Sequence, residues 1–155
     1  MISDVKRLIE LAEDKLKFLE TLLILNDDLN TAINSQNLDD IKNLLIKKQG
    51  IIDNIDKIDT DFIPMYNLYK KVNKIDSIFN TSNNNTDKSK LKGILIDIKS
   101  TLSKIKEKDD KNMEDINKTF KKVESKLNEL SKGKNGYIEY VKYYSPDSYF
   151  VDKKR

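Results

Sequence analysis

Residues 37–62 read NLDDIKNLLIKKQGIIDNIDKIDTDF and set the architecture of this chain. Asn37 can cap a helix by accepting hydrogen bonds from its free N–H groups, and Asp39 and Asp40 favour the positive end of the helix dipole. Apolar side chains then recur every three or four positions, which is the spacing of one helical face. They are Leu38, Ile41, Leu44, Leu45, Ile51, Ile52, Ile55, Ile58 and Phe62. The pattern predicts a long amphipathic helix that begins after Asn37.

The same spacing precedes this helix. Ser3 or Asp4 is predicted to cap a first helix. Its apolar face contains Val5, Leu8, Ile9, Ala12, Leu16, Leu19, Leu22, Leu23, Leu29 and Ile33. Residues 34–37 (NSQN) form a short polar connection. Because the connection is short, we expect the two helices to form an antiparallel hairpin.

The apolar face continues through Pro64 to Phe79. Since proline removes a helical hydrogen bond and crowds the preceding turn, we expect a kink or a one-turn break there, with helix resuming to about Asn80. Residues 81–87 (TSNNNTD) are predicted to form a loop, because their side chains compete with helical hydrogen bonding.

A last long helix is predicted over residues 89–131. Its apolar face contains Leu91, Ile94, Leu95, Ile98, Leu102, Ile105, Met113, Ile116, Phe120, Val123, Leu127 and Leu130. Residues 106–112 interrupt this face with charged side chains, so we expect a solvated or frayed stretch there. Gly133 and Gly136 end the helix.

These patterns predict an all-α fold: an elongated, coiled-coil-like antiparallel helical hairpin or bundle of three to four long helices. The bundle is expected over residues 1–132 and a Tyr-rich C-terminal tail over residues 133–155. The tail holds five of the seven tyrosines in the chain. It is interpreted either as a segment that packs on the bundle or as a recognition segment. We favour recognition, because tyrosine gives a large contact area at low entropic cost.

The composition argues against catalysis. The 155 residues include no Cys and no His, which removes thiolate chemistry and the usual general base near neutral pH. The longest apolar run, residues 22–25, is far too short to span a membrane, and no signal peptide opens the chain. We therefore expect a cytoplasmic, non-enzymatic protein that has no cofactor or metal and does not insert into membranes.

The charge distribution argues against nucleic-acid binding. Residues 1–80 carry 11 basic and 14 acidic side chains, and residues 81–155 carry 18 basic and 12 acidic ones. This mild asymmetry is not the dense basic stripe of a nucleic-acid-binding protein.

One part of the last apolar face is a candidate binding surface. The last helix is longer than a hairpin partner of ordinary length would cover, so its end can expose an apolar groove that binds a helix. Ordinary intramolecular core is an equal alternative. The residues concerned are Ile116, Phe120, Val123, Leu127 and Leu130.

Two stretches carry a resemblance to a known family. Residues 37–49 (NLDDIKNLLIKKQ) follow a leading helix, and residues 112–123 (NMEDINKTFKKV) precede two further leucines, a Gly-containing break and tyrosine. This arrangement, which covers nearly the whole chain, resembles the FlgN family of flagellar export chaperones. The resemblance implies a cytoplasmic helical chaperone. Such a protein binds the helical C-terminal region of flagellar hook-associated proteins, which form the hook–filament junction, and delivers them to the type III export gate.

The resemblance also implies a role for two tyrosines. A tyrosine after the last helix is linked to gate docking in the family, and the nearest matches here are Tyr137 and Tyr140. The family commonly has Tyr-Gly at this point, whereas this chain has Tyr137-Ile138 and Tyr140-Val141. Two alternatives stay open at the level of sequence: a structural coiled-coil or adaptor protein without an export role, and an export chaperone for the filament cap. The sequence leaves a homodimer open as well.

Overall fold

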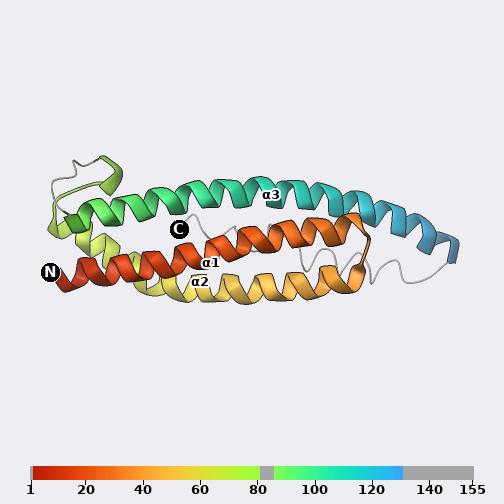
Figure 1. The fold of residues 1–155 in the computed structure, drawn as a ribbon, viewed down its shortest axis with the longest axis horizontal. Coiled ribbons are helices and arrows are strands. Elements are labelled where there is room, and N and C mark those ends of the chain that lie inside the picture. The colour runs from red at the N-terminus through yellow and green to blue at the C-terminus, as the bar shows by residue number, and fades with distance from the viewer. Residues whose placement is uncertain (1, 81–85, 131–155) are drawn as a thin grey trace. The chain divides into compact units, whose positions relative to one another are not determined.

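The structure is a computed structural model. It describes residues 2–80 and 86–130, but not the side chains of residues 2, 3, 123 and 126–130. Its elements are α1 (Ile2–Asn34), α2 (Leu38–Val72), the short 3₁₀ helix η1 (Ile78–Asn80) and α3 (Thr86–Leu130) (Figure 1). The described residues form three long helices and no strand, which confirms the all-α prediction. No helix in these ranges is long and apolar enough to cross a membrane.

The two predicted N-terminal caps have different outcomes. Since α1 begins at Ile2, Ser3 and Asp4 lie inside it, and the prediction that one of them caps the helix is wrong. Asp4 instead places a carboxylate in the first turn, where the helix dipole favours it. The cap of α2 is confirmed, because Asn37 Oδ1 accepts a hydrogen bond of 3.1 Å from the backbone N–H of Asp40.

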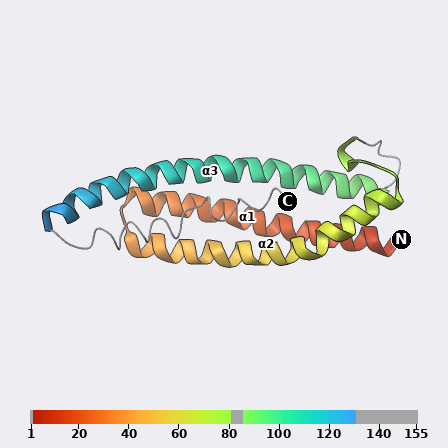
Figure 2. The same cartoon turned by 180° about the vertical axis from the view of Figure 1, so that it is seen from behind.

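Pro64 lies inside α2 and does not interrupt it. Of the two predicted alternatives, the one-turn break is therefore wrong and the kink is confirmed. The helix instead bends in the yellow part of its ribbon, which Figure 2 shows clearly. A bend is the expected response to the missing N–H and the crowding of the proline ring. α2 ends at Val72 rather than at about Asn80, and the chain then forms a turn and the separate η1, in which Ile78 is fully buried.

α2 ends earlier than predicted because the chain forms a turn for which the sequence has no glycine signal. Lys74 takes a left-handed φ of 54°. The N–H groups of Lys74 and Ile75 donate to the carbonyls of Lys71 and Lys70, at 3.2 and 3.0 Å. This pattern closes a helix and usually has glycine at the left-handed position. The turn after α1 repeats it around Gln36, whose φ is 57°.

α3 begins at Thr86, three residues before its predicted start, and ends at Leu130, one residue before its predicted end. Residues 106–112 are regular helix, and Asp109 and Asn112 are buried within them. The prediction of a frayed stretch is therefore wrong, and the prediction of a solvated stretch holds for Lys106, Glu107, Asp110 and Lys111 but not for Asp109 and Asn112. The reason is that polar side chains of the neighbouring helices receive these two residues, as described below.

The described chain packs as two units. Among the described residues, the first unit contains residues 2–23, 50–80 and 86–105, and the second contains residues 24–49 and 106–130. Each long helix contributes to both units, and within each unit α2 runs antiparallel to α1 and α3 (Figures 1 and 2). The predicted hairpin of α1 and α2 is thus present. The core of the first unit includes Leu8 and Leu19 of α1, Ile52 and Ile55 of α2, Ile78 of η1, and Leu91, Ile98 and Ile105 of α3.

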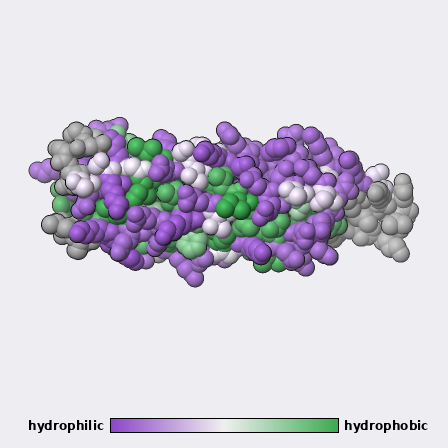
Figure 3. Space-filling view, in the orientation of Figure 1, coloured by the Kyte–Doolittle hydropathy of each residue, from purple (hydrophilic) through white to green (hydrophobic). Residues whose placement is uncertain are grey.

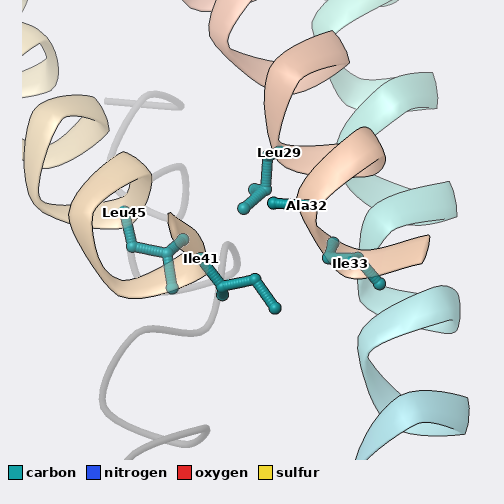
Figure 4. Packing of buried hydrophobic residues seen from close by; sticks show 5 residues of the cluster. All are labelled: Leu29, Ala32, Ile33, Ile41 and Leu45. Atoms are coloured by element: carbon teal, nitrogen blue, oxygen red, sulfur yellow. The ribbon is translucent and has the colours of Figure 1, made fainter. Parts of the chain in front are cut away.

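The second unit has a smaller apolar core. It consists of Leu29, Ala32 and Ile33 of α1 and Ile41 and Leu45 of α2 (Figure 4). Leu44 and Ile116 pack against this cluster from its edges. The rest of the interior of this unit is polar, and it forms part of the candidate site.

Candidate protein-binding surfaces

The predicted groove on α3 is described only in part. Ile116 is half-buried and packs against the apolar cluster of the second unit. One turn further on, Thr119 Oγ1 lies 3.5 Å from the carbonyl oxygen of Ile33, and Phe120 is half-buried. This part of the face therefore contacts the hairpin of α1 and α2, which supports the core interpretation for Ile116.

The remaining predicted residues lie outside what the structure describes. Val123, Leu127 and Leu130 are helical residues of α3, but their side chains are not described. Tyr137 and Tyr140 fall in residues 131–155, outside the described ranges. The groove at the end of α3 and the role of the tail therefore stay predictions.

A cluster of four polar side chains fills the interior of the second unit. Lys48 of α2 and Asp109 of α3 are 1% and 5% exposed, and Lys48 Nζ lies 2.5 Å from Asp109 Oδ1. Asn26 of α1 and Asn112 of α3 are each 1% exposed, and Asn112 Nδ2 donates to the backbone carbonyl of Asn26 at 3.0 Å. This polar cluster connects all three helices of the unit.

Further bonds extend the polar cluster towards solvent. Asn30 Nδ2 donates to Asn112 Oδ1 at 2.9 Å and to Asp115 Oδ2 at 3.0 Å. Lys108 Nζ pairs with Asp27 Oδ1 at 2.6 Å on the surface. The contact of α3 with α1 in this unit therefore depends largely on polar groups.

Burial works against both charges of the Lys48–Asp109 pair. It lowers the pKa of Lys48, and the negative charge of Asp109 opposes this shift. Burial likewise raises the pKa of Asp109, which Lys48 and the nearby Asn26 oppose. Within the described residues, Asp109 Oδ2 and both side-chain amide atoms of Asn26 have no hydrogen bond of ordinary geometry. A buried ion pair of this kind adds little net stability, because desolvation offsets the attraction between its charges. Its best-attested role is to fix helix pairing and register.

A sequence signal for the polar cluster exists, and the search for an apolar face missed it. Lys48 follows Leu45 by three positions and precedes Ile52 by four, so it occupies a core position of the α2 pattern. Asp109 follows Ile105 by four positions on α3 and occupies a core position in the same way. Charged residues at core positions of a helical pattern are the signal that finds both.

The first unit contains a groove of about 550 Å³. Its apolar floor comes mainly from α2, and polar residues of three helices complete the lining. Val5, Pro64, Met65, Leu68, Tyr69 and Val72 are apolar or aromatic, and Asp4, Asp61, Asn73 and Asp87 are polar. Figure 3 shows one face of the protein, which is mostly hydrophilic and carries limited apolar patches.

Two large apolar side chains of the groove are exposed. Leu68 is 55% exposed and Val72 is 45% exposed. They follow Pro64 at intervals of four residues, so all three lie on one face of α2. Contiguous exposed apolar side chains mark an interaction surface more often than scattered ones do.

Aromatic contacts position the part of α2 that carries the groove. The rings of Phe62 and Tyr66 stack with centroids 5.4 Å apart, and the Tyr66 hydroxyl interacts with the backbone of Ile78 in η1. Burial raises the pKa of the Tyr69 hydroxyl, and Tyr66 and Asp87 add to this shift. Tyr66 thus links α2 to η1. The effect of Asp87 on Tyr69 indicates that Tyr69 lies close to the start of α3.

The described residues thus form an all-α protein of three long helices, with a polar interior in one unit and an apolar groove in the other. The family model described as FlgN protein matches residues 1–147. The chain therefore belongs to the FlgN family, and the resemblance seen in its sequence is confirmed. This is a family of flagellar export chaperones rather than of enzymes, so the chain has a general role in export during flagellum assembly. Searches of the curated proteins and of the solved structures gave no significant match.

Proposed function

We propose that this chain is a cytoplasmic chaperone that binds the helical C-terminal region of flagellar hook-associated proteins and delivers them to the type III export gate. The observation that carries the proposal is the family match over residues 1–147, which includes all three long helices. The long amphipathic α3 supports it, because a helical client can be bound along an apolar helix face.

The proposed client surface follows the part of α3 that packs against the apolar core of the second unit. Ile116 packs against the core of the second unit, and Phe120 is the last described apolar side chain on this face. Val123, Leu127 and Leu130 continue the predicted face. We assign client binding to Phe120 and these three residues, with Ile116 at the boundary between core and surface.

Client binding can be tested with the Phe120→Asp/Leu127→Asp double variant. It should abolish binding of the C-terminal segment of a hook-associated protein, measured by calorimetry, while circular dichroism stays helical. Ile96→Asp is the matched control, because Ile96 lies on the same helix and is 47% exposed. Its binding should equal that of the wild type. Unfolding of the double variant would show that the face is core.

Gate docking is assigned to the tail. Tyr137→Ala/Tyr140→Ala should weaken binding to the cytoplasmic part of the export gate, because each change removes a contact worth roughly 1–3 kcal/mol at a hot spot. Client affinity should stay unchanged, and Tyr149→Ala should match the wild type in both assays. Unchanged gate binding by the double variant would end the docking role.

The two alternatives give different results in the same assays. An adaptor without an export role would bind neither the client segment nor the gate. A filament-cap chaperone would bind the C-terminal helical segment of the cap protein in preference to that of the hook-associated proteins. The proposal requires the opposite preference.

A further inference from the structure

The groove of the first unit has an apolar floor on one face of α2. Pro64, Leu68 and Val72 are separated by four residues each, and Met65 and Tyr69 lie beside them at the same interval. α1 contributes only Val5 to the apolar part of the lining. Among the described residues, this face of α2 is therefore only partly covered. Leu68 and Val72 keep about half of their surface exposed.

The polar part of the lining is acidic. Among the ten described lining residues there are three aspartates and no lysine, arginine or glutamate. Asp4 belongs to α1, Asp61 to α2 and Asp87 to α3, so the carboxylates come from three helices. The chain as a whole carries a net charge of +3, so this negative charge is a local property of the groove.

We infer that this groove is a docking site for an amphipathic helix of a partner protein whose apolar face is flanked by lysine or arginine. An apolar floor on a helix face accepts the apolar side chains of a second helix at spacings of three and four. The three carboxylates select basic flanking residues by charge complementarity. The face from Asp61 to Asn73 is on the order of 18 Å long at 1.5 Å per residue, so it accommodates roughly 12 residues of helix.

This site is distinct from the client surface assigned to α3. Its residues belong to the first unit, whereas the α3 surface belongs to the second. Helix docking in this groove requires neither the export role nor the identity of the client. A failure of client binding would therefore leave it standing, and its own failure would leave the proposed function standing.

The test uses the full-length chain and a synthetic probe. The probe is an amphipathic peptide of about 14 residues with leucines at helical spacing and lysines elsewhere, and the control peptide carries glutamates in place of the lysines. Fluorescence anisotropy gives the affinities, and methyl-resolved NMR of the isoleucine, leucine and valine side chains locates the peptide. The lysine peptide should bind about tenfold or more tightly than the glutamate peptide, and its largest shifts should fall on the Val5, Leu68 and Val72 methyls.

Two groove variants separate the apolar and the electrostatic contribution. Leu68→Ser/Val72→Ser should weaken lysine-peptide binding by about tenfold or more, because it removes both exposed apolar contacts. Asp4→Asn/Asp61→Asn/Asp87→Asn should weaken binding and remove most of its dependence on salt. The control Ile46→Ser/Ile96→Ser changes two side chains of similar exposure, 50% and 47%, outside the groove lining and should bind like the wild type.

Four results would overturn the inference. Equal affinity for both peptides would remove the charge complementarity, and shifts centred on Ile24 or Ile46 would place the peptide elsewhere. The chain has no cysteine, so a spin label on Tyr149→Cys is unique in the chain. Broadening of the Leu68 and Val72 methyls by this label in the dilute free chain would show that the tail fills the groove. Shift changes of the Leu68 and Val72 methyls that appear only at concentrations where the chain dimerises would assign the groove to a second copy.

Discussion

Among the described residues, the two units differ most in their interiors, because the second unit buries four polar side chains and the first buries one, Asp59. Both units expose large apolar side chains, such as Ile24 and Ile46 in the second, but in the first unit the half-exposed Leu68 and Val72 line one groove. The second unit places polar side chains in its interior, with Lys48 and Asp109 nearly inaccessible to solvent. The helices are the same three in both units, so the periodicity that builds the bundle does not distinguish them. The departures do, and departures from a consistent pattern are where function and specificity are expected.

The ion pairs show the same contrast. In the first unit Lys15 Nζ lies 2.7 Å from Asp59 Oδ1, and the lysine side chain keeps 21% of its surface exposed. In the second unit the Lys48 side chain keeps 1%. The two aspartates are equally buried, with 7% of each side chain exposed, so the contrast lies in the access of water to the lysine. We therefore infer that the second unit depends on its polar pair for correct folding, and that the first unit uses its exposed apolar face for binding.

The largest expected effect is on the stability of the second unit. Asp109→Ala leaves the Lys48 charge buried without its partner and should lower the free energy of unfolding by about 3–5 kcal/mol. Lys108→Ala is the control, because it removes only the exposed pair with Asp27 and should cost about 1 kcal/mol or less. Urea unfolding followed by circular dichroism measures both. Equal small losses would contradict the distinction between the two units.

The next effect concerns the bend in the first unit. Pro64→Ala restores a backbone N–H and removes the crowding of the proline ring, so it should raise the free energy of unfolding by about 1–3 kcal/mol. If the bend shapes the groove, affinity for the lysine peptide should fall in the same variant. Asn67→Ala, at an exposed position three residues further on, should gain no more than about 0.7 kcal/mol from helix propensity. A destabilised Pro64→Ala variant would show that packing, rather than the proline, imposes the bend.

A smaller effect is expected from pH. Burial raises the pKa of Asp109 above its ordinary value of 3.8, so between these two values the folded chain binds more protons than the unfolded chain. The stability that this group contributes is therefore fully present below pH 3.8 and is lost as the pH rises through its folded-state pKa. Carboxyl-carbon NMR should give a titration midpoint for Asp109 above 3.8. A midpoint below 3.8 would mean that attraction to Lys48 outweighs burial.

The smallest effect on stability is expected at the groove. Leu68→Ser/Val72→Ser should change the free energy of unfolding by no more than about 0.5 kcal/mol per site, because both side chains are already exposed. Leu8→Ala in the same unit removes a fully buried side chain and should cost about 2–5 kcal/mol. A groove variant as unstable as Leu8→Ala would mean that Leu68 and Val72 are packing residues.

Most of the helical architecture follows from the sequence, because periodic apolar residues and the Asn37 cap act locally. The early end of α2 does not, because Lys74 adopts a left-handed conformation that usually signals glycine. At Pro64 the sequence predicts either a kink or a one-turn break, and the structure has a bend without a break. Packing by surrounding residues can keep a helix continuous at a proline, although the proline locally destabilises it.

The candidate site was predicted less completely than the fold. An apolar search places Ile116 on the last helix but cannot show that the hairpin of α1 and α2 receives it. The same search passes over Lys48 and Asp109, because two charges at core positions become acceptable only when tertiary structure brings them together. The groove combines apolar side chains of α2 with carboxylates from three helices, so it exists only in the folded chain.

The most direct test of the central claim, that this FlgN-family chain works by binding a helical client, is calorimetry of the full-length wild-type chain. The titrant is the C-terminal segment of a hook-associated protein, and the measurement is made at two temperatures. Binding with a negative heat-capacity change is predicted, because an apolar helix face leaves water when the client is bound. No binding heat at either temperature, with the chain folded and the segment soluble, would contradict the claim.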